Sequence, residues 1–302
     1  MTLDPRVPRR GSRPSPAAIH TKNPALPPRV RSLLPTAAAP GWVIAAMLLY
    51  IAATSAWVFS PCFPVQWLQA LDSASGGWLA STLVLAVGFG IVELWLLFGP
   101  GRQRPGDLGW QVGALPAAIA ATLALWIAMN AATVFASHLE GTPLAGHPGW
   151  VEPGRLAGDL IAQVFGTALL EETVFRAWLW PQLALAMARR WSTRRAWGMA
   201  LLASQAAFAL LHVPALLTAG MTLPGLAGTV LMLFLTGIVL ALLYAAARNL
   251  FFVVGVHALG NAPTLLFAPQ GPAPTLVLLG AAVLVALAWW GWRSAREARS
   301  AS

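Results

Sequence analysis

The chain is built from long apolar runs, and these runs constrain its fold more than any other feature. An α-helix needs about 20 residues to cross the hydrocarbon core of a bilayer. Runs of that length recur near 42–59, 78–99, 111–136, 159–181, 196–217, 223–247, 250–268 and 274–292. Hydrophobic residues make up 58% of the 302 residues and charged residues only 10%. We therefore predict an all-α fold, a polytopic bundle of eight membrane-spanning helices.

The basic residues are sorted between alternate loops of this predicted bundle. If the N-terminus is cytoplasmic, the cytoplasmic segments hold almost all arginines and the opposite side holds only Arg155. Cytoplasmic loops of membrane proteins carry such an excess. The pattern predicts that both termini are cytoplasmic, and it assigns the net charge of +9 to contact with anionic lipids, not to nucleic acid. Cys62 is the only cysteine, which excludes a disulfide framework.

Composition also predicts the domain boundaries. Residues 1–40 are rich in Pro and Arg, and we expect them to form a disordered basic cytoplasmic tail. A transmembrane helical domain is predicted over 41–293, followed by a short cytoplasmic tail at 294–302. Because arginine greatly outnumbers lysine, we expect a GC-rich bacterial genome and a multi-pass protein of the bacterial inner membrane.

Charged residues lie inside one predicted span, in the run LLEETVFRAWLW. Charge at that depth costs about 2.5–3.5 kcal/mol per residue on insertion scales, so such a cluster indicates a functional site. Glu172 and Arg176 are four residues apart and can pair on one helical face, whereas Glu171 points elsewhere. The unpaired carboxylate suits a general base; the alternative is a charge network that only holds helices together. Glu93, in the second run, is expected to form an interhelical hydrogen bond.

Two further polar pairs lie on later apolar runs. Phe208 and His212 are four residues apart near the end of the fifth run, and His257 and Asn261 have the same spacing in the seventh. Pro214 should loosen the helix after His212, so that side chains or water must satisfy the freed backbone groups. Either pair alone would more often be a contact between helices than a catalytic group. We predict that all three motifs meet in one wet pocket inside the bundle.

The three motifs in this order resemble a known family. EExxxR, FxxxH and HxxxN on successive hydrophobic helices are similar to the CPBP intramembrane proteases, named for CAAX prenyl endopeptidases and bacteriocin-processing proteins. The resemblance covers residues 157–266. One departure is Ala177, where many relatives have Gly, and it removes no chemical group. The resemblance implies an endopeptidase that hydrolyses a peptide bond of a membrane-embedded or membrane-anchored protein or peptide.

The resemblance also implies a set of catalytic residues. The set contains the charged and polar members of the three motifs, with the two histidines: Glu171, Glu172, Arg176, His212, His257 and Asn261. In this scheme Glu171 and His212 activate a water, and His257 and Asn261 stabilise the oxyanion. The second glutamate and the arginine orient Glu171 and balance its charge.

The same family has also been described as metalloproteases, so zinc is the alternative cofactor. Zinc catalysis commonly uses three protein ligands, which Glu171, His212 and His257 could supply. However, no HExxH motif is present. Asn261 is a poor zinc ligand but a good donor to an oxyanion. We therefore favour a glutamic-type hydrolase without a cofactor over a zinc enzyme.

Three functions without proteolysis are also compatible with polar residues in a helical bundle. A proton-coupled transporter could use Glu, His and Arg as a relay, but the chain shows no inverted repeat. A haem-binding subunit could use His212 and His257 as axial ligands, but that chemistry does not require the acidic pair. A scaffolding or immunity protein of the same family would keep the motifs without cutting.

Overall fold

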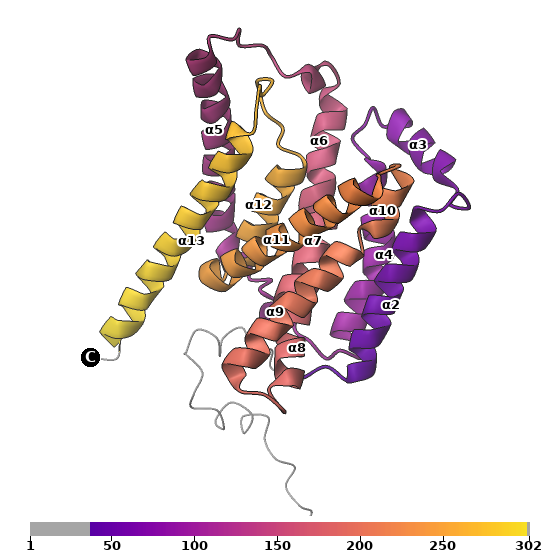
Figure 1. Ribbon diagram of the computed structural model, residues 1–302, viewed down its shortest axis with the longest axis vertical. Coiled ribbons are helices and arrows are strands. Elements are labelled where there is room, and N and C mark those ends of the chain that lie inside the picture. The colour runs from indigo at the N-terminus through magenta and orange to yellow at the C-terminus, as the bar shows by residue number, and fades with distance from the viewer. Residues whose placement is uncertain (1–36, 301–302) are drawn as a thin grey trace, which may run out of the picture.

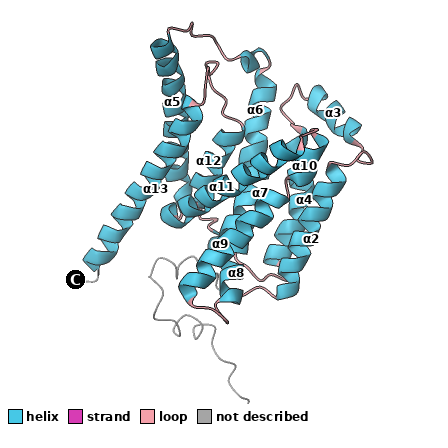
Figure 2. Ribbon diagram, in the orientation of Figure 1, coloured by secondary structure: helices cyan, strands magenta, loops and turns pink. Residues whose placement is uncertain are grey.

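A computed structural model describes residues 37–300 of the chain (Figure 1). Most of the predicted tail at 1–40 therefore lies outside the described residues. Within them the chain forms helices joined by loops, and the only extended pairing is an isolated bridge between Gly146 and Phe267 (Figure 2). The predicted all-α fold is confirmed.

Six helical segments of the described chain are long and apolar enough to cross a membrane. They are α2 (Gly41–Val58), α4 (Ser81–Phe98), the segment that ends in α5 (Leu115–Glu140), α9 (Thr193–Leu210) continued by α10 (Val213–Thr218), α11 (Leu223–Ala247) and α13 (Ala273–Ser300). The segment before α5 contains the short helices η2 (Pro105–Leu108) and η3 (Val112–Ala114). Two more short helices, α3 (Val65–Ala74) and η4 (Pro148–Val151), lie in loops. The chain is thus an integral, multi-pass membrane protein.

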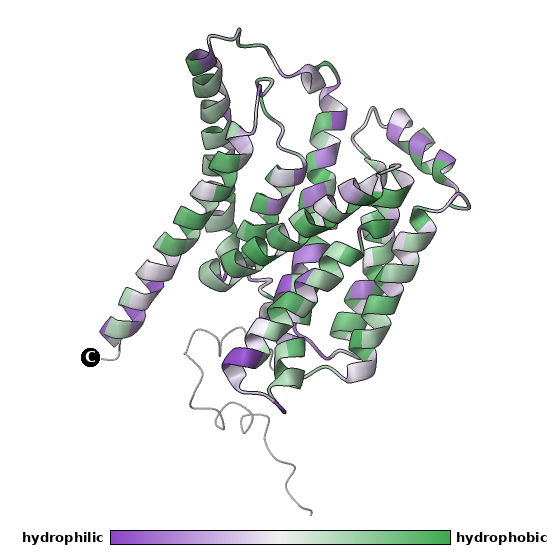
Figure 3. Cartoon of the chain, in the orientation of Figure 1, coloured by the Kyte–Doolittle hydropathy of each residue, from purple (hydrophilic) through white to green (hydrophobic). Residues whose placement is uncertain are grey.

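The predicted span at 159–181 lies inside one longer helical run. Its parts follow each other without a gap: α6 (Pro153–Ala162), η5 (Gln163–Thr167), α7 (Ala168–Glu171), η6 (Glu172–Leu179) and α8 (Trp180–Met187). Both η5 and η6 are π-helical. This geometry is rare in proteins, and where it occurs it is often at a functional site. Purple segments in Figure 3 mark the polar residues along this run, while most of the surrounding helices are green.

The predicted span at 250–268 is corrected by the structure. The helix that forms there, α12 (Leu250–Asn261), has only 12 residues and is shorter than a full crossing requires. It ends because Pro263 disfavours helical geometry in the residue before it. Because α12 is too short to count as a full crossing, the predicted total of eight crossings is not confirmed.

The non-helical chain after α12 is held by side chains of other helices. Its carbonyl oxygens at Thr264 and Leu265 accept hydrogen bonds from the indole N–H groups of Trp126 and Trp150. The amide of Leu266 donates to the Asn130 carboxamide at 2.8 Å. Irregular backbone inside a membrane protein is tolerated where protein groups satisfy it in this way.

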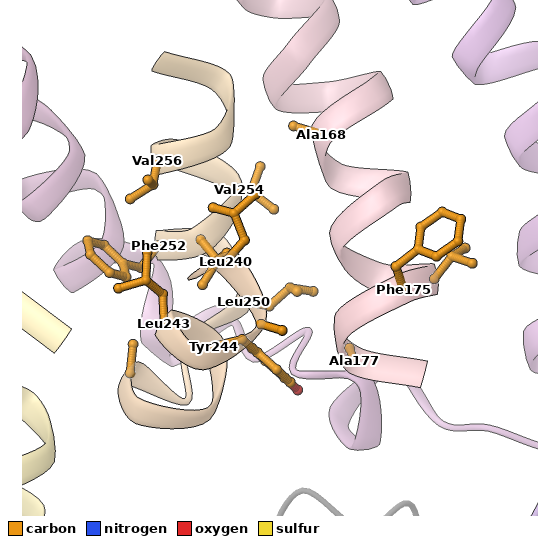
Figure 4. Packing of buried hydrophobic residues seen from close by; sticks show 14 of the residues in the cluster. Ala168, Phe175, Ala177, Leu240, Leu243, Tyr244, Leu250, Phe252, Val254 and Val256 are labelled. Carbon is orange, nitrogen blue, oxygen red and sulfur yellow. The ribbon is translucent and has the colours of Figure 1, made fainter. Parts of the chain in front are cut away.

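The helix α12 lies at the centre of the bundle. It packs against α5, α11 and α13 and against the run that contains η5, α7 and η6. Figure 4 shows Phe252, Val254 and Val256 beside Leu240 of α11, with Phe175 on the neighbouring run. The start of α2 and the end of α13 lie at the same end of the bundle (Figure 1). The helix α13 continues to Ser300, through most of the predicted C-terminal tail.

A close contact between α12 and α5 gives a prediction about stability. A Cβ atom added at Gly255 would overlap the Thr122 side chain, whereas one added at Gly260 would meet open space. Overpacking typically costs about 1–3 kcal/mol. We expect Gly255→Ala to lower the free energy of unfolding by that amount in a denaturant titration. Gly260→Ala, the same change one turn later, should not destabilise the protein, and equal effects of both would contradict the packing described here.

Candidate active site

The helical run separates the two neighbouring glutamates. Adjacent residues of a helix point in directions about 100° apart. The Glu172 side chain is 0% exposed, whereas that of Glu171 is 22% exposed. The sequence prediction that the two carboxylates point to different places agrees with this arrangement.

Glu172 and Arg176 form a buried ion pair. Nη1 of Arg176 lies 3.2 Å from Oε1 of Glu172, and both side chains are 0% exposed. The guanidinium also lies 4.1 Å from the centroid of the Phe208 ring, a cation–π contact. Phe208, from the second motif, thus supports the arginine of the first, a contact that the sequence analysis did not predict.

His257 connects the ion pair to the other glutamate. Its Nδ1 lies 2.7 Å from Oε1 of Glu172. A carboxylate paired with arginine is an acceptor, so Nδ1 carries the hydrogen, and in the neutral form of the ring the free lone pair is then on Nε2. That Nε2 lies 3.6 Å from Oε2 of Glu171. The resemblance implied that Glu172 orients Glu171; in the structure the Glu172 carboxylate contacts Arg176 and His257 instead.

His212 lies where the helix between α9 and α10 breaks. Its Nδ1 is 2.8 Å from the carbonyl oxygen of Phe208. Because a carbonyl only accepts, Nδ1 is the donor, and a side chain satisfies the loosened backbone as the position of Pro214 predicted. Nε2 of His212 then lies 3.9 Å from Oε1 of Glu171. Each oxygen of Glu171 therefore faces the Nε2 atom of one histidine.

Asn261 is one helical turn beyond His257 and is exposed. Its Nδ2 donates a hydrogen bond of 3.0 Å to Oε1 of Gln163 in η5. Gln163 was not among the predicted site residues, although a polar side chain in that apolar run was a signal for it. The structure therefore brings Glu171, His212 and His257 together directly and places Asn261 at the adjoining turn.

An apolar cavity of about 320 Å³ opens beside Glu171 and His212. Residues of α2, α4, α7, η6, α9 and α10 line it, and most are apolar, such as Ile51, Leu85 and Phe89. Cavities of this size accommodate a small ligand or a few side chains. The exposed edge of the glutamate–histidine cluster thus faces a space that an extended, largely apolar segment could enter.

The three predicted metal ligands, Glu171, His212 and His257, lie close together. Over residues 37–300, no group of three or more His, Cys, Asp and Glu side chains is arranged to hold a metal ion. The Nδ1 atoms of both histidines are engaged by protein oxygens, and their Nε2 atoms lie 3.6 and 3.9 Å from Glu171. A His that binds a metal through Nε2 usually donates its Nδ1–H to a protein oxygen, so these contacts are compatible with a glutamic-type protease and with a metalloprotease.

The fold and this cluster define a polytopic membrane protein with acidic and imidazole groups inside its bundle. Residues 153–263 match the model of a protein family described as Rce1-like, type II CAAX prenyl endopeptidase. The three motifs lie within this segment, and the match confirms the resemblance to CAAX prenyl endopeptidases that they predicted. A comparison with curated proteins gave no match, and neither did one with solved structures.

Proposed function

We propose that this protein is a glutamic-type intramembrane endopeptidase of the bacterial inner membrane. The observation that carries the proposal is that Glu171 lies between the Nε2 atoms of His212 and His257 at the edge of an apolar cavity. A carboxylate and two ring nitrogens at one point can hold and deprotonate a water molecule. The family match to a CAAX prenyl endopeptidase supports peptide hydrolysis as the reaction.

In the proposed reaction, Glu171 removes a proton from a water held at the cavity edge. The water oxygen forms a bond to the carbonyl carbon of the scissile peptide, whose oxygen becomes negatively charged. The proton held by the cluster is then transferred to the leaving nitrogen as the C–N bond breaks. His212 is positioned for this work because its Nδ1 is held by the Phe208 carbonyl and its Nε2 faces the glutamate.

His257 and Asn261 are proposed to stabilise the oxyanion. The Glu172 carboxylate accepts a hydrogen bond from Nδ1 of His257 at 2.7 Å and so fixes the direction of Nε2. When Nε2 also carries a proton, the ring donates it in a hydrogen bond to the developing charge. Asn261 uses one N–H of its carboxamide for Gln163 and retains the other. Arg176 pairs with Glu172 at 3.2 Å and so maintains this chain of contacts.

The proposal is tested with purified protein in proteoliposomes. A library of single-span peptides is incubated with the protein, and mass spectrometry detects new termini. We expect cleavage within or beside the apolar segment of some peptides, and we expect the rate to be unchanged after dialysis against a strong chelator. Loss of cleavage on chelation with recovery on zinc addition would show the metal-dependent alternative. Absence of cleavage together with proton-coupled uptake would show a transporter.

A further inference from the structure

We propose that Glu93 determines substrate specificity by binding the ammonium or guanidinium group of a Lys or Arg side chain of the substrate. This inference rests on the proposed function, because it assigns the chemistry that the same cavity selects. Glu93 is only 9% exposed and lines the cavity on α4, with Glu171 in the same lining. It has no part in the hydrolytic steps described above.

The helix α4 packs closely on the helical run that contains Glu171, and this packing places the Glu93 carboxyl group near Glu171. A Cβ atom at Gly90 would lie 2.6 Å from Cδ1 of Leu170, and one at Gly166 would lie 2.8 Å from Cβ of Ala86. Such contacts between small residues let two helices approach closely. Glu93 follows Gly90 by three residues and Glu171 follows Leu170, so both carboxyl groups border one space.

Glu93 lacks a protein partner in the part of the chain that the structure describes. The expected interhelical hydrogen bond does not form, and no ion pair reaches this side chain between residues 37 and 300. The Tyr50 hydroxyl donates to the carbonyl oxygen of Phe89 instead, at 3.1 Å. A buried carboxyl group without a partner is costly, and a ligand that supplies a partner removes that cost.

The charges around the cavity favour a cation as that partner. Arg176 is 0% exposed and is paired with Glu172, so it does not neutralise the cavity. Both imidazoles face Glu171. Glu93, the other acidic residue in the cavity lining, does not share these contacts. Lys and Arg combine an apolar stem with a charged end, which matches apolar walls such as Leu85 and Phe89 with a carboxylate among them.

The first test uses any peptide that wild-type protein cleaves. Positions near the cut are changed one at a time to Lys or to the uncharged norleucine. We expect Lys at one position to raise kcat/KM by about 10-fold, the size of a charge-assisted hydrogen bond, mainly through KM. Glu93→Gln should remove this preference and Glu93→Lys should transfer it to Glu. An unchanged preference in Glu93→Gln would overturn the inference while leaving the protease proposal intact.

The second test does not depend on cleavage. Binding of dodecylammonium and of dodecanol is measured on protein in lipid nanodiscs. Wild-type protein should bind the cation about 10-fold more tightly, and Glu93→Gln should lose the difference. The control is Glu140→Gln, which makes the same change at an exposed residue at the end of α5 and should behave as wild type. Equal binding of the cation by Glu93→Gln and Glu140→Gln would overturn the inference.

Discussion

Replacing Glu171 with Gln is expected to lower kcat for peptide hydrolysis by at least about 100-fold, the lower end of what a positioned general base contributes. Gln has nearly the same shape and keeps contacts with both histidines, but it cannot accept the proton of the attacking water. The measurement is the initial rate of cleavage in proteoliposomes at saturating peptide. The loss should appear in kcat, because Gln preserves the surface that the substrate contacts.

Glu140→Gln is the matched control for this prediction. It neutralises an exposed glutamate at the end of α5, away from the lining of the cavity. Its kcat should equal that of wild type. A correctly folded Glu171→Gln protein that cleaves at the wild-type rate would exclude Glu171 as the base.

Replacing Arg176 with Met is expected to lower the free energy of unfolding by about 3–5 kcal/mol, the usual cost of breaking a buried ion pair. The change leaves the Glu172 carboxylate 0% exposed without its counter-charge. It also removes the cation from the face of the Phe208 ring, 4.1 Å away. The measurement is unfolding in mixed micelles of increasing SDS content, followed by tryptophan fluorescence.

The double variant Glu172→Gln with Arg176→Met separates charge burial from packing. Removing both charges removes most of the penalty, so the double variant should be more stable than Arg176→Met alone. Hydrolysis should not recover, because the Oε1 atom of Gln can still accept from Nδ1 of His257 but no longer supplies a negative charge beside the ring. The single variant Glu172→Gln completes the comparison. If the loss of stability in the double variant equals the sum of the losses in Glu172→Gln and Arg176→Met, the two side chains do not interact as the structure indicates.

The sequence predicted the faces of individual helices well. Spacing of four correctly predicted that Glu172 pairs with Arg176 and that Glu171 points elsewhere, because these relations depend only on helical geometry. The helix break at His212 was predicted from Pro214 for the same reason. The contact between Glu172 and Arg176 forms although both residues lie in the π-helical segment η6.

The contacts between helices were harder to predict. The pairing of Asn261 with Gln163, and of Arg176 with the Phe208 ring, depends on which faces meet in the bundle. Tertiary packing decides this, and spacing along one helix contains no information about it. The early end of α12 was missed because Pro263 lies within an apolar run whose hydropathy resembles a full span. Likewise, the sequence could not predict that Glu93 borders the same cavity as Glu171, because this depends on how α4 packs against α7.

The central claim is that Glu171 and His212 act as one unit on a bound peptide. The most direct test is the single-turnover rate of cleavage by Glu171→Gln, by His212→Ala and by the variant that carries both changes. Residues that act as a unit show non-additive losses. We predict that the double variant is no slower than the slower single variant. Losses that multiply, or a double variant that cleaves at the wild-type rate, would contradict the claim.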